Sequence, residues 1–394
     1  MRGAYFTTTG NPDVITIGEL PEPDPRAGEV KIRVIAVSVN RVDTYIRAGK
    51  YRTELSQPAL IGRDAIGEIV AIGDGVSLDR FDSRRGVPAS VPLVWTNSMG
   101  YDGRQGVAAQ YICVPQERLY PAPTNVYGQA SEHTTHAKYE ASTNNDDSQG
   151  ERGSRMHASS SPHPISAHEF IACVHSAATA AIVLNSVMRV RNGERLLVEG
   201  AGGHVGTKFT ELAAARGLDV YTTSNPRDFE RLAALGASHT FDYADPDLFT
   251  TLARATQDAT AQPEGHHRNQ DATPTVPRPG GFAHIVDTSG RVPFARNLDL
   301  LGIHGEMTMI TPPPDHEAGL DLWSFYTSSK QLNGFVISHA STDQLSAAAR
   351  VINDAVDNGM LLGDPVDVLP LSEAARAHER VESGHERSRI VLTL

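Results

Sequence analysis

The residues with the clearest chemical potential form a glycine-rich segment, GAGGHVG, at 200–206. A short apolar run, RLLVE, precedes it, and a pattern typical of a helix follows it. In such a strand, turn and helix, Gly200 lets the chain leave the strand and Gly203 keeps side chains away from a pyrophosphate. Gly206 lets the helix approach the strand, and the helix N-terminus faces the phosphate groups. The segment therefore predicts a dinucleotide-binding loop, with a tight turn and a packing glycine as the alternative.

The end of the next predicted strand indicates which dinucleotide binds. Proteins that bind NAD carry an acidic residue about 20 residues past the glycines, where it contacts the ribose hydroxyls. The residues at that place here are Thr222, Thr223, Ser224, Asn225 and, two positions later, Arg227. Hydroxyl groups and a guanidinium can donate to a 2′-phosphate, so NADPH is favoured. Asp219 lies too early in the strand, and Asp228 is expected to point along the next helix. Arg227 could instead be a surface residue of the first helical turn.

Strands and helices alternate in the part of the chain around this loop. Apolar runs typical of buried strands lie at 195–199, 219–223, 239–243, 282–287 and 306–310, and helical patterns lie at 205–217, 227–235 and 293–301. This alternation predicts an α/β fold, with a doubly wound parallel sheet covered on both faces. The beginning of the chain differs, because glycine and proline separate its short apolar runs at 30–37, 65–73 and 108–114. That part predicts a compact, mostly β domain.

Two stretches, 125–168 and 256–280, are nearly all polar and show no apolar periodicity. Such segments bury too little apolar surface to offset their ordering entropy, so they predict flexible surface insertions. No spacing among their histidines resembles a set of metal ligands, and these side chains are expected to be solvated: His133, His136, His157, His163, His266 and His267.

Composition narrows the class of protein. The 394 residues suit two domains, and 40% hydrophobic with 21% charged residues is typical of a soluble globular chain. The net charge of −12 argues against binding to nucleic acid or anionic lipid. No uninterrupted apolar run reaches the roughly 18 residues of a membrane span, so a cytoplasmic location is expected. The two cysteines, Cys113 and Cys173, cannot form a disulfide framework and are expected to be core residues.

Six segments together resemble one protein superfamily. They are NRVDTYIRAGKY (40–51), IGRDAIGEIVAIG (61–73), VRNGERLLVEGAGGHVG (190–206), LAALGASHTFDY (232–243), GGFAHIVDTSG (280–290) and AHERVESGHERSRIVLTL (377–394). In this order they resemble the medium-chain dehydrogenase/reductase superfamily, specifically its zinc-free quinone oxidoreductase branch, which includes the zeta-crystallin-like proteins. The resemblance spans most of the chain apart from the two polar stretches.

The resemblance implies a domain organisation. It consists of a GroES-like β-rich catalytic domain over 1–124, the polar insertion over 125–168, a Rossmann domain over 169–338 that contains the insertion 256–280, and a C-terminal segment over 339–394 that completes the catalytic domain. The active site is expected in the cleft between the two domains. The segment KQLNGFVISH (330–339) resembles the family's dimer-edge strand, so a homodimer is expected, with an edge strand inside one chain as the alternative.

A resident zinc ion is not expected. Catalytic zinc in related dehydrogenases needs a thiolate, an imidazole and a further thiolate or carboxylate. This chain has Arg63 and Asp64 where those relatives place His and Glu, and Asn40 and Asp43 where a thiolate would be. Without a metal to lower the pKa of an alcohol, reduction of an electrophilic acceptor is the easier reaction.

The expected reaction is transfer of a hydride from NADPH to a quinone or a similar electron-poor carbonyl compound. It needs a proton or a hydrogen bond at the developing oxyanion. The resemblance places Asn40 and Tyr45 beside the nicotinamide, where Asn40 would orient the substrate or the cofactor amide. Tyr45 would donate through its phenol, or else be an aromatic packing residue. Arg47 would face the cleft or be a solvated surface residue. The alternatives are an enoyl or alkenal reductase, and an NADPH-binding redox sensor or structural protein without turnover.

The resemblance also extends the expected cofactor site. Arg389 matches the basic residue that reaches from the last strand to the cofactor pyrophosphate. Other members follow strands at their carboxyl ends, where ligands of doubly wound sheets bind. His204, inside the glycine loop, would contact phosphate or point outward. The full expected set is Gly200, Ala201, Gly203, His204, Val205, Gly206, Ser224, Arg227, Thr288, Ser289, Gly290, Ile310, Thr311 and Arg389.

Overall fold

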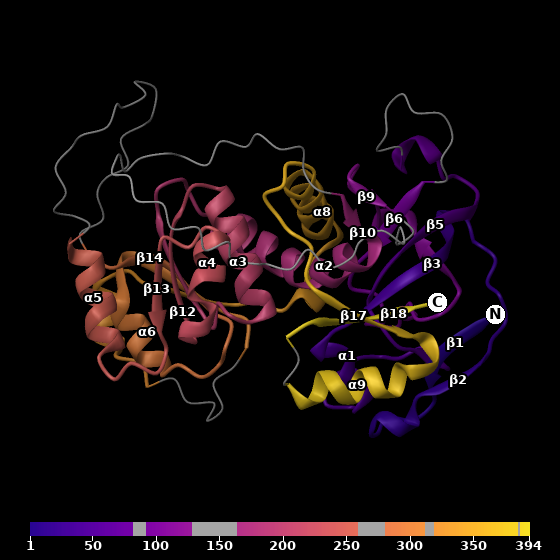
Figure 1. The fold of residues 1–394 in the computed structure, drawn as a ribbon, viewed down its shortest axis with the longest axis horizontal. Helices are drawn as coiled ribbons and strands as arrows, with labels where there is room; N and C mark the ends of the chain where they lie inside the picture. Colours follow the sequence, from indigo (N-terminus) through magenta and orange to yellow (C-terminus); the bar gives the residue numbers. More distant parts are fainter. Residues whose placement is uncertain (82–91, 128–163, 259–279, 312–318, 385–386) are drawn as a thin grey trace, which may run out of the picture.

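The computed structural model describes residues 1–81, 92–127, 164–258, 280–311, 319–384 and 387–394. Two domains of different construction lie side by side (Figure 1). One is a β-rich domain built from both ends of the chain, and the other is a parallel sheet flanked by helices. This is the α/β fold class that the sequence predicts, a GroES-like domain beside a Rossmann domain.

The β-rich domain is organised around β3 (Glu29–Val39), a long strand of mostly buried Val, Ile and Ala side chains. Its sheet contains, in spatial order, β17 (Val366–Pro370), β18 (Arg389–Thr393), β3, β5 (Asp64–Ile72), β6 (Leu93–Thr96) and β8 (Leu119–Pro121), with β7 (Tyr111–Pro115) also on β3. A smaller sheet holds β2 (Thr16–Glu19), β1 (Arg2–Phe6) and β4 (Ala59–Leu60), and two helices, α1 (Arg41–Arg47) and α9 (Ala374–Ser383), pack on one another. The last strand of the chain therefore lies in the sheet of the first domain.

The second domain is a six-stranded sheet whose strands are all parallel. Its spatial order is β13 (His239–Asp242), β12 (Asp219–Ser224), β11 (Arg195–Glu199), β14 (Phe282–Asp287), β15 (Leu301–Met309) and β16 (Gln331–Gly334). The connecting helices are α3 (His204–Ala215), α4 (Phe229–Ala234), α5 (Leu248–Asp258), α6 (Phe294–Leu300) and α7 (Leu322–Thr327). In chain order this is 3-2-1-4-5-6, the order of dinucleotide-binding sheets, in which ligands bind where the order reverses. That point lies between β11 and β14.

A central helix, α2 (Ala167–Ile182), continues as a π-helical turn (Val183–Val187) and lies between the two domains (Figure 1). Ser166 caps its first turn and forms a reciprocal capping box with Glu169. The helix contacts β3 and β5 on one side, and α3 and α8 (Thr342–Asp357) on the other. Its length and composition would allow it to cross a membrane, but 78% of its apolar window is buried inside the protein. Its apolar character therefore has an explanation in core packing.

Most predicted elements are present, and several bounds differ. β11 and β14 have the predicted limits, whereas β15 begins five residues before the predicted start at 306 and β16 covers only part of 330–339. The polar stretches 125–168 and 256–280, with their histidines, lie mostly outside the described residues. The described ends of the first stretch form a short parallel pair, β9 (Val126–Tyr127) with β10 (Ile165–Ser166).

Single helical turns of the 3-10 type complete the described structure. They cover Pro12–Val14, Leu78–Phe81, Gln116–Arg118, Pro226–Asp228, Ile337–His339 and Leu371–Glu373. One of them, Ile337–His339, follows β16 and contacts the β-rich domain. There Ser338 accepts a hydrogen bond from Arg63 at 2.8 Å, and His339 lies 2.8 Å from the hydroxyl of Tyr101.

Candidate functional site

The glycine loop connects β11 to α3 with the geometry that its spacing predicts. Gly200 has a φ of +70°, which favours glycine, and Gly203 is the N-cap of α3. A Cβ on Gly206 would lie 2.5 Å from the carbonyl oxygen of Gly200 and 2.6 Å from the Cα of Ala201. The backbones of α3 and β11 are therefore so close at Gly206 that no side chain fits between them. The loop exposes a helix N-terminus at the carboxyl edge of the sheet, where a phosphate group would be stabilised.

The turn that follows β14 lies against the glycine loop. The hydroxyl of Thr288 donates to the carbonyl oxygens of Glu199 and Gly200, at 2.7 and 3.2 Å. The carboxylate of Asp287 accepts hydrogen bonds from the backbone N–H and the hydroxyl of Ser289, both at 2.8 Å. Two of the predicted cofactor segments therefore meet at the point where the strand order reverses.

The remaining predicted residues at this edge occupy separate positions. The backbone N–H of Gly290 also donates to Asp287, at 3.1 Å, so this residue belongs to the same turn. Ile310 and Thr311 directly follow β15 at the carboxyl edge of the sheet, and Ile310 packs against the main hydrophobic core. Ala201 is fully buried, and Val205 packs against the core in the first turn of α3. Their contacts with a cofactor stay predictions.

A buried acid that the sequence analysis did not single out lies at the end of β11. Glu199 is fully buried, and the side-chain amide of Asn297 donates to its Oε2. Burial, together with the nearby carboxylate of Asp287, raises the pKa of Glu199 well above its ordinary value. Among the described residues, neither Glu199 Oε1 nor Asn297 Oδ1 has a hydrogen-bond partner. A protonated Glu199 would donate from Oε1 to that oxygen and satisfy both atoms.

Replacement Glu199→Gln is therefore expected to stabilise the protein at neutral pH. The folded pKa of this carboxyl lies above its unfolded value, so its contribution is full below the unfolded pKa and is lost as pH rises toward the folded pKa. An amide makes the same paired hydrogen bonds without a proton to hold. Urea unfolding at pH 5 and pH 8 should show an advantage of about 1 kcal/mol for the variant at pH 8 only. Equal stabilities at pH 8 would contradict the protonated pair.

The corner after β12 differs from the expectation for Asp228. Arg231 donates to a carboxylate oxygen of Asp228 at 3.1 Å and to the carbonyl oxygen of Gly202 at 2.9 Å. Asp228 thus turns back toward the glycine loop and does not point along α4. Ser224 is buried, and the side chain of Arg227 is 62% exposed. Arg231, on α4, was not predicted as a site residue, although it comes only four positions after Arg227.

Arg389 lies close to the glycine loop although it comes from the last strand. Its guanidinium donates to the hydroxyl of Ser176 on α2, and its Nε lies 3.4 Å from a carboxylate oxygen of Asp364. Burial and the nearby charge of Arg389 lower the pKa of His204 to about 3. His204 is therefore a neutral, partly buried imidazole in the glycine loop, and its contact with phosphate stays a prediction. A contact of Arg389 with pyrophosphate stays a prediction, and this placement supports it.

A buried lysine helps to hold this arrangement. Lys208, on α3, lies 2.8 Å from Asp364 and 2.8 Å from Glu211, and it donates to the carbonyl oxygen of Leu362 at 2.8 Å. Asp364 therefore has a cation on each side, Lys208 and Arg389, which together lower its pKa against the opposing effect of burial. Nothing in the local sequence signals this cluster, because its members come from three distant segments.

The predicted catalytic residue Asn40 belongs to a buried polar cluster. It is the N-cap of α1, and its backbone N–H donates to Asp43 at 2.7 Å. Its side-chain amide donates to Asp64 at 2.7 Å. Asp64 is fully buried, accepts from the backbone N–H of Ser98 at 3.0 Å and lies 3.1 Å from Nδ1 of His175. His175 is thus a site residue that sequence reasoning missed, since α2 reads as an apolar core helix.

Charge explains why this buried carboxylate is tolerated. Burial alone would raise the pKa of Asp64, but His175, the Ser98 N–H and Arg63 together hold it below its ordinary value. Its neighbour Asp43 has the opposite balance, because burial and the negative charge of Asp64 raise the pKa of Asp43 to about 7. The cluster therefore contains one firmly ionised carboxylate and one that is close to neutralisation.

The other two predicted catalytic residues, both on α1, differ in exposure. Tyr45 is 40% exposed, and its hydroxyl accepts a hydrogen bond from Arg41 at 3.2 Å, so it is not a buried packing residue. Arg47 is only 1% exposed and neither faces a cleft nor is solvated. It donates to the carbonyl oxygen of Gly10 at 2.5 Å and pairs with Glu382 of α9. The ion pair joins α1 to α9. Arg47 therefore has a structural role in place of the catalytic role that was expected.

The donor atoms present here do not fit a resident zinc ion. Arg63 is buried where related dehydrogenases place a histidine ligand, and its Nε donates to the carbonyl oxygen of Met99 at 3.0 Å. Within the described ranges, no three His, Cys, Asp or Glu side chains are grouped so that they could hold a metal. Burial raises the pKa of Cys173 to about 12 and that of Cys113 to about 11, which opposes thiolate formation.

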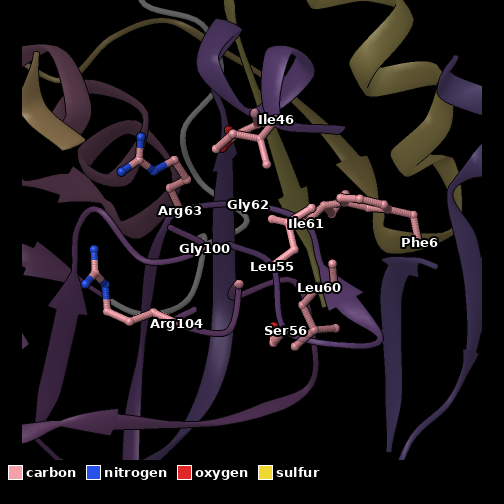
Figure 2. Close-up of a pocket in the computed structure, with 13 residues that line it drawn as sticks. Phe6, Ile46, Leu55, Ser56, Leu60, Ile61, Gly62, Arg63, Gly100 and Arg104 are labelled. Carbon is pink, nitrogen blue, oxygen red and sulfur yellow. The ribbon is translucent and has the colours of Figure 1, made fainter. Parts of the chain in front are cut away.

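A small pocket lies next to this cluster, and both Asp43 and Arg63 line it (Figure 2). Its free volume is about 10 Å³, which is close to the minimum for one water molecule. The other residues around it are Phe6, Ile46, Leu55, Ser56, Ala59, Leu60, Ile61, Gly62, Gly100, Arg104 and Gly106. Asp43 Oδ1 is buried without a partner in the described structure, so a water molecule there would satisfy it. The pocket is too small for a quinone ring.

Comparison with known proteins places this geometry in context. Two family models match the chain: the alcohol dehydrogenase GroES-like domain over residues 26–124 and the zinc-binding dehydrogenase over residues 235–392. Quinone oxidoreductase from Rattus norvegicus is 23% identical over 402 residues, which cover 100% of this chain and 98% of that protein. Trans-enoyl reductase tazE from Aspergillus terreus is 24% identical over 254 residues, covering 64% of this chain and 71% of that protein.

Other matches are partial or structural. Dehydrogenase azaJ from Aspergillus niger is 26% identical over 249 residues, and the match spans 62% of each chain. A mycobacterial quinone oxidoreductase has the same fold, with a TM-score of 0.71, 23% identity and full coverage of both chains. A mycobacterial structure in complex with NADPH gives a TM-score of 0.68 at 22% identity, again with full coverage of both chains.

Proposed function

Because the chain belongs to the medium-chain dehydrogenase/reductase superfamily, in its quinone oxidoreductase-like branch, we propose that it transfers a hydride from NADPH to a quinone or similar electron-poor carbonyl acceptor without a metal ion. A nicotinamide cofactor and an oxidoreductase activity follow from the family. One observation carries the finer proposal: at the positions where the resemblance implies zinc ligands in related dehydrogenases, Asn40 and Asp64 instead form a hydrogen-bonded cluster with His175. The same chain has a glycine loop with dinucleotide geometry.

The nicotinamide ring, when bound, supplies the hydride. The chain's own residues bind and orient the cofactor. The helix N-terminus at Gly203 and the guanidinium of Arg389 would neutralise the pyrophosphate. Arg227 and Arg231 would pair with a 2′-phosphate, which favours NADPH, whereas Asp228 at the same corner would favour ribose hydroxyls. Because two arginines and only one aspartate lie at this corner, the balance of charge supports binding of NADPH over NADH.

The direct test is an assay of the purified protein with NADPH and 1,4-benzoquinone. Oxidation of NADPH is expected, with the same rate after dialysis against a strong chelator. The parallel titration with NADH should give a weaker affinity. Absence of turnover across a panel of quinones and enones would overturn the proposal, and loss of activity after chelation would overturn its metal-free part.

An enoyl or alkenal reductase is the alternative that the relative from Aspergillus terreus supports. It shares the hydride step but places the hydride and the proton on carbon. With NADPH deuterated at C4, carbon-bound deuterium in the product would identify this reaction. Tight binding of NADPH with no acceptor reduced would instead identify a sensor or structural protein.

The homodimer expected from 330–339 is also proposed. β16 lies at the edge of the parallel sheet, and no described strand pairs with its outer side. The helix before it, α7, exposes large apolar side chains: Leu322 (70%), Trp323 (76%) and Tyr326 (77%). Pairing of two β16 edges across a two-fold axis would cover both features. Light scattering of the purified protein distinguishes one copy from two.

A further inference from the structure

His175 is held by a buried carboxylate in a way that fixes its orientation. Its Nδ1 lies 3.1 Å from Oδ2 of Asp64, which is fully buried on β5. Asp64 is held in turn by the amide of Asn40 and the N–H of Ser98. A carboxylate that accepts from Nδ1 sets the tautomer and the orientation of the ring. The other nitrogen, Nε2, is then the atom that exchanges a proton.

That second nitrogen is accessible. The side chain of His175 is 13% exposed although it lies on a buried helix. Nε2 makes no hydrogen bond to any other described residue, and it is not among the fully buried atoms that lack a partner. His378 provides a contrast, because it is fully buried with neither ring nitrogen bonded to a described residue, and its pKa is lowered to about 3. His175 has one ring nitrogen fixed and one open.

The position of His175 along the helix relates it to the cofactor. The next residue, Ser176, accepts a hydrogen bond from Arg389, which lies near His204 of the glycine loop. Residues 175 and 176 of α2 therefore connect the cluster of Asn40 to the arginine proposed for the pyrophosphate. A nicotinamide cofactor that contacts both Arg389 and Asn40 would extend past this point of α2.

We propose that His175, oriented by Asp64, donates the proton that completes reduction of the acceptor. The inference rests on the proposed function. The C4–H bond of NADPH breaks and its electron pair moves with the hydrogen to the quinone, leaving NADP⁺ and a hydroquinone anion. The Nε2–H bond of the imidazolium then breaks, an O–H bond forms on that anion, and neutral His175 regains a proton from solvent. One NADPH, one quinone and one proton give NADP⁺ and hydroquinone.

Several charged groups surround this pair. Asp64 begins β5 and Arg63 directly precedes it, Asp43 comes from α1, and Arg389 of β18 lies nearby through its hydrogen bond to Ser176. Asp64 is in direct contact with the imidazole, with its Oδ2 3.1 Å from Nδ1.

The test replaces His175 with Asn, whose Nδ2 can still donate to Asp64 but cannot supply a proton. With wild-type protein, kcat for benzoquinone should fall as pH rises, because the cationic imidazole is the proton donor. In His175→Asn, kcat at pH 7 should drop by about 100-fold or more and this pH dependence should disappear. The NADPH dissociation constant, measured by fluorescence, should stay within about twofold. His168→Asn, on the same helix two turns earlier, is the matched control and should keep the wild-type profile.

A second variant addresses the orienting role of the carboxylate. Asp64→Asn should lower kcat less than His175→Asn does, because the proton donor remains and only its orientation by the carboxylate is lost. Histidine nitrogen NMR of the wild-type protein should show Nδ1 protonated in the neutral ring, a readout that does not depend on turnover.

A His175→Asn enzyme that keeps its kcat and its pH profile would overturn the inference and leave the proposed function standing. A 100-fold loss in Tyr45→Phe with an unchanged profile in His175→Asn would assign the proton to Tyr45. Wild-type protein that reduces no acceptor would overturn both proposals.

Discussion

Gly206→Ala is expected to weaken binding of the nicotinamide cofactor by about 100-fold or more and to remove activity with it. The added Cβ would lie 2.5 Å from the carbonyl oxygen of Gly200 and 2.6 Å from the Cα of Ala201. Both contacts are with backbone, so no side chain can rotate to relieve them. The helix α3 must move away from β11, and its N-terminus then leaves the position in which it faces a phosphate. Fluorescence titration with NADPH measures the loss, and circular dichroism checks that the protein is folded.

Gly334→Ala is the matched control for this prediction. Gly334 lies in β16 of the same sheet, a Cβ there meets nothing within 4 Å, and its φ is not positive. Its cofactor affinity should equal that of the wild-type protein. Gly203→Ala should fall between the two, because its Cβ would lie 3.3 Å from the carbonyl oxygen of Gly200. If Gly206→Ala binds NADPH as well as Gly334→Ala does, the glycine loop is not the phosphate site.

Local signals explain why much of the fold could be predicted from the sequence. RLLVE and FAHIVD are short apolar runs with polar or glycine neighbours, and both form strands with the predicted limits. The turn at Gly200 and the close approach at Gly206 depend on residues only a few positions apart, so their spacing alone indicates the geometry. The family resemblance then indicated that the C-terminal segment completes the first domain, and the structure shows that its last strand pairs with β3.

The parts that sequence could not predict depend on contacts between distant segments. Asp64 and His175 are 111 positions apart, and His175 lies in an otherwise apolar helix that reads as core. Arg47 reads as a surface or cleft residue until Glu382, 335 positions later, is seen to neutralise it. A charge is recognised as buried or catalytic only when its partner is known. Motif reasoning therefore indicated the geometry of the glycine loop better than the contacts of the buried polar cluster around Asp64.

A second buried histidine is expected to matter for stability. His284 is 3% exposed on β14 and lies between two carboxylates, with Nε2 2.7 Å from Glu194 and Nδ1 2.9 Å from Glu306. Asn333 of β16 donates to the second carboxylate at 3.2 Å. Burial alone would lower the pKa of His284, but the hydrogen bonds and charges of the two carboxylates more than reverse this and raise it. The cation thereby joins three neighbouring segments of the parallel sheet.

His284→Leu should lower the free energy of unfolding by about 3 kcal/mol at pH 6, because two largely buried carboxylates then face each other without the cation between them. The loss should depend on pH. The folded pKa of His284 lies above its unfolded value of about 6.5, so its contribution is full below pH 6.5 and declines as pH rises through the folded pKa. Urea unfolding of both proteins at pH 6 and pH 9 should therefore show a smaller difference at pH 9. His284→Gln, which can donate to one carboxylate but carries no charge, should lie between them at pH 6. A difference below about 1 kcal/mol at pH 6, or one that does not change with pH, would show that His284 is not protonated in the folded protein.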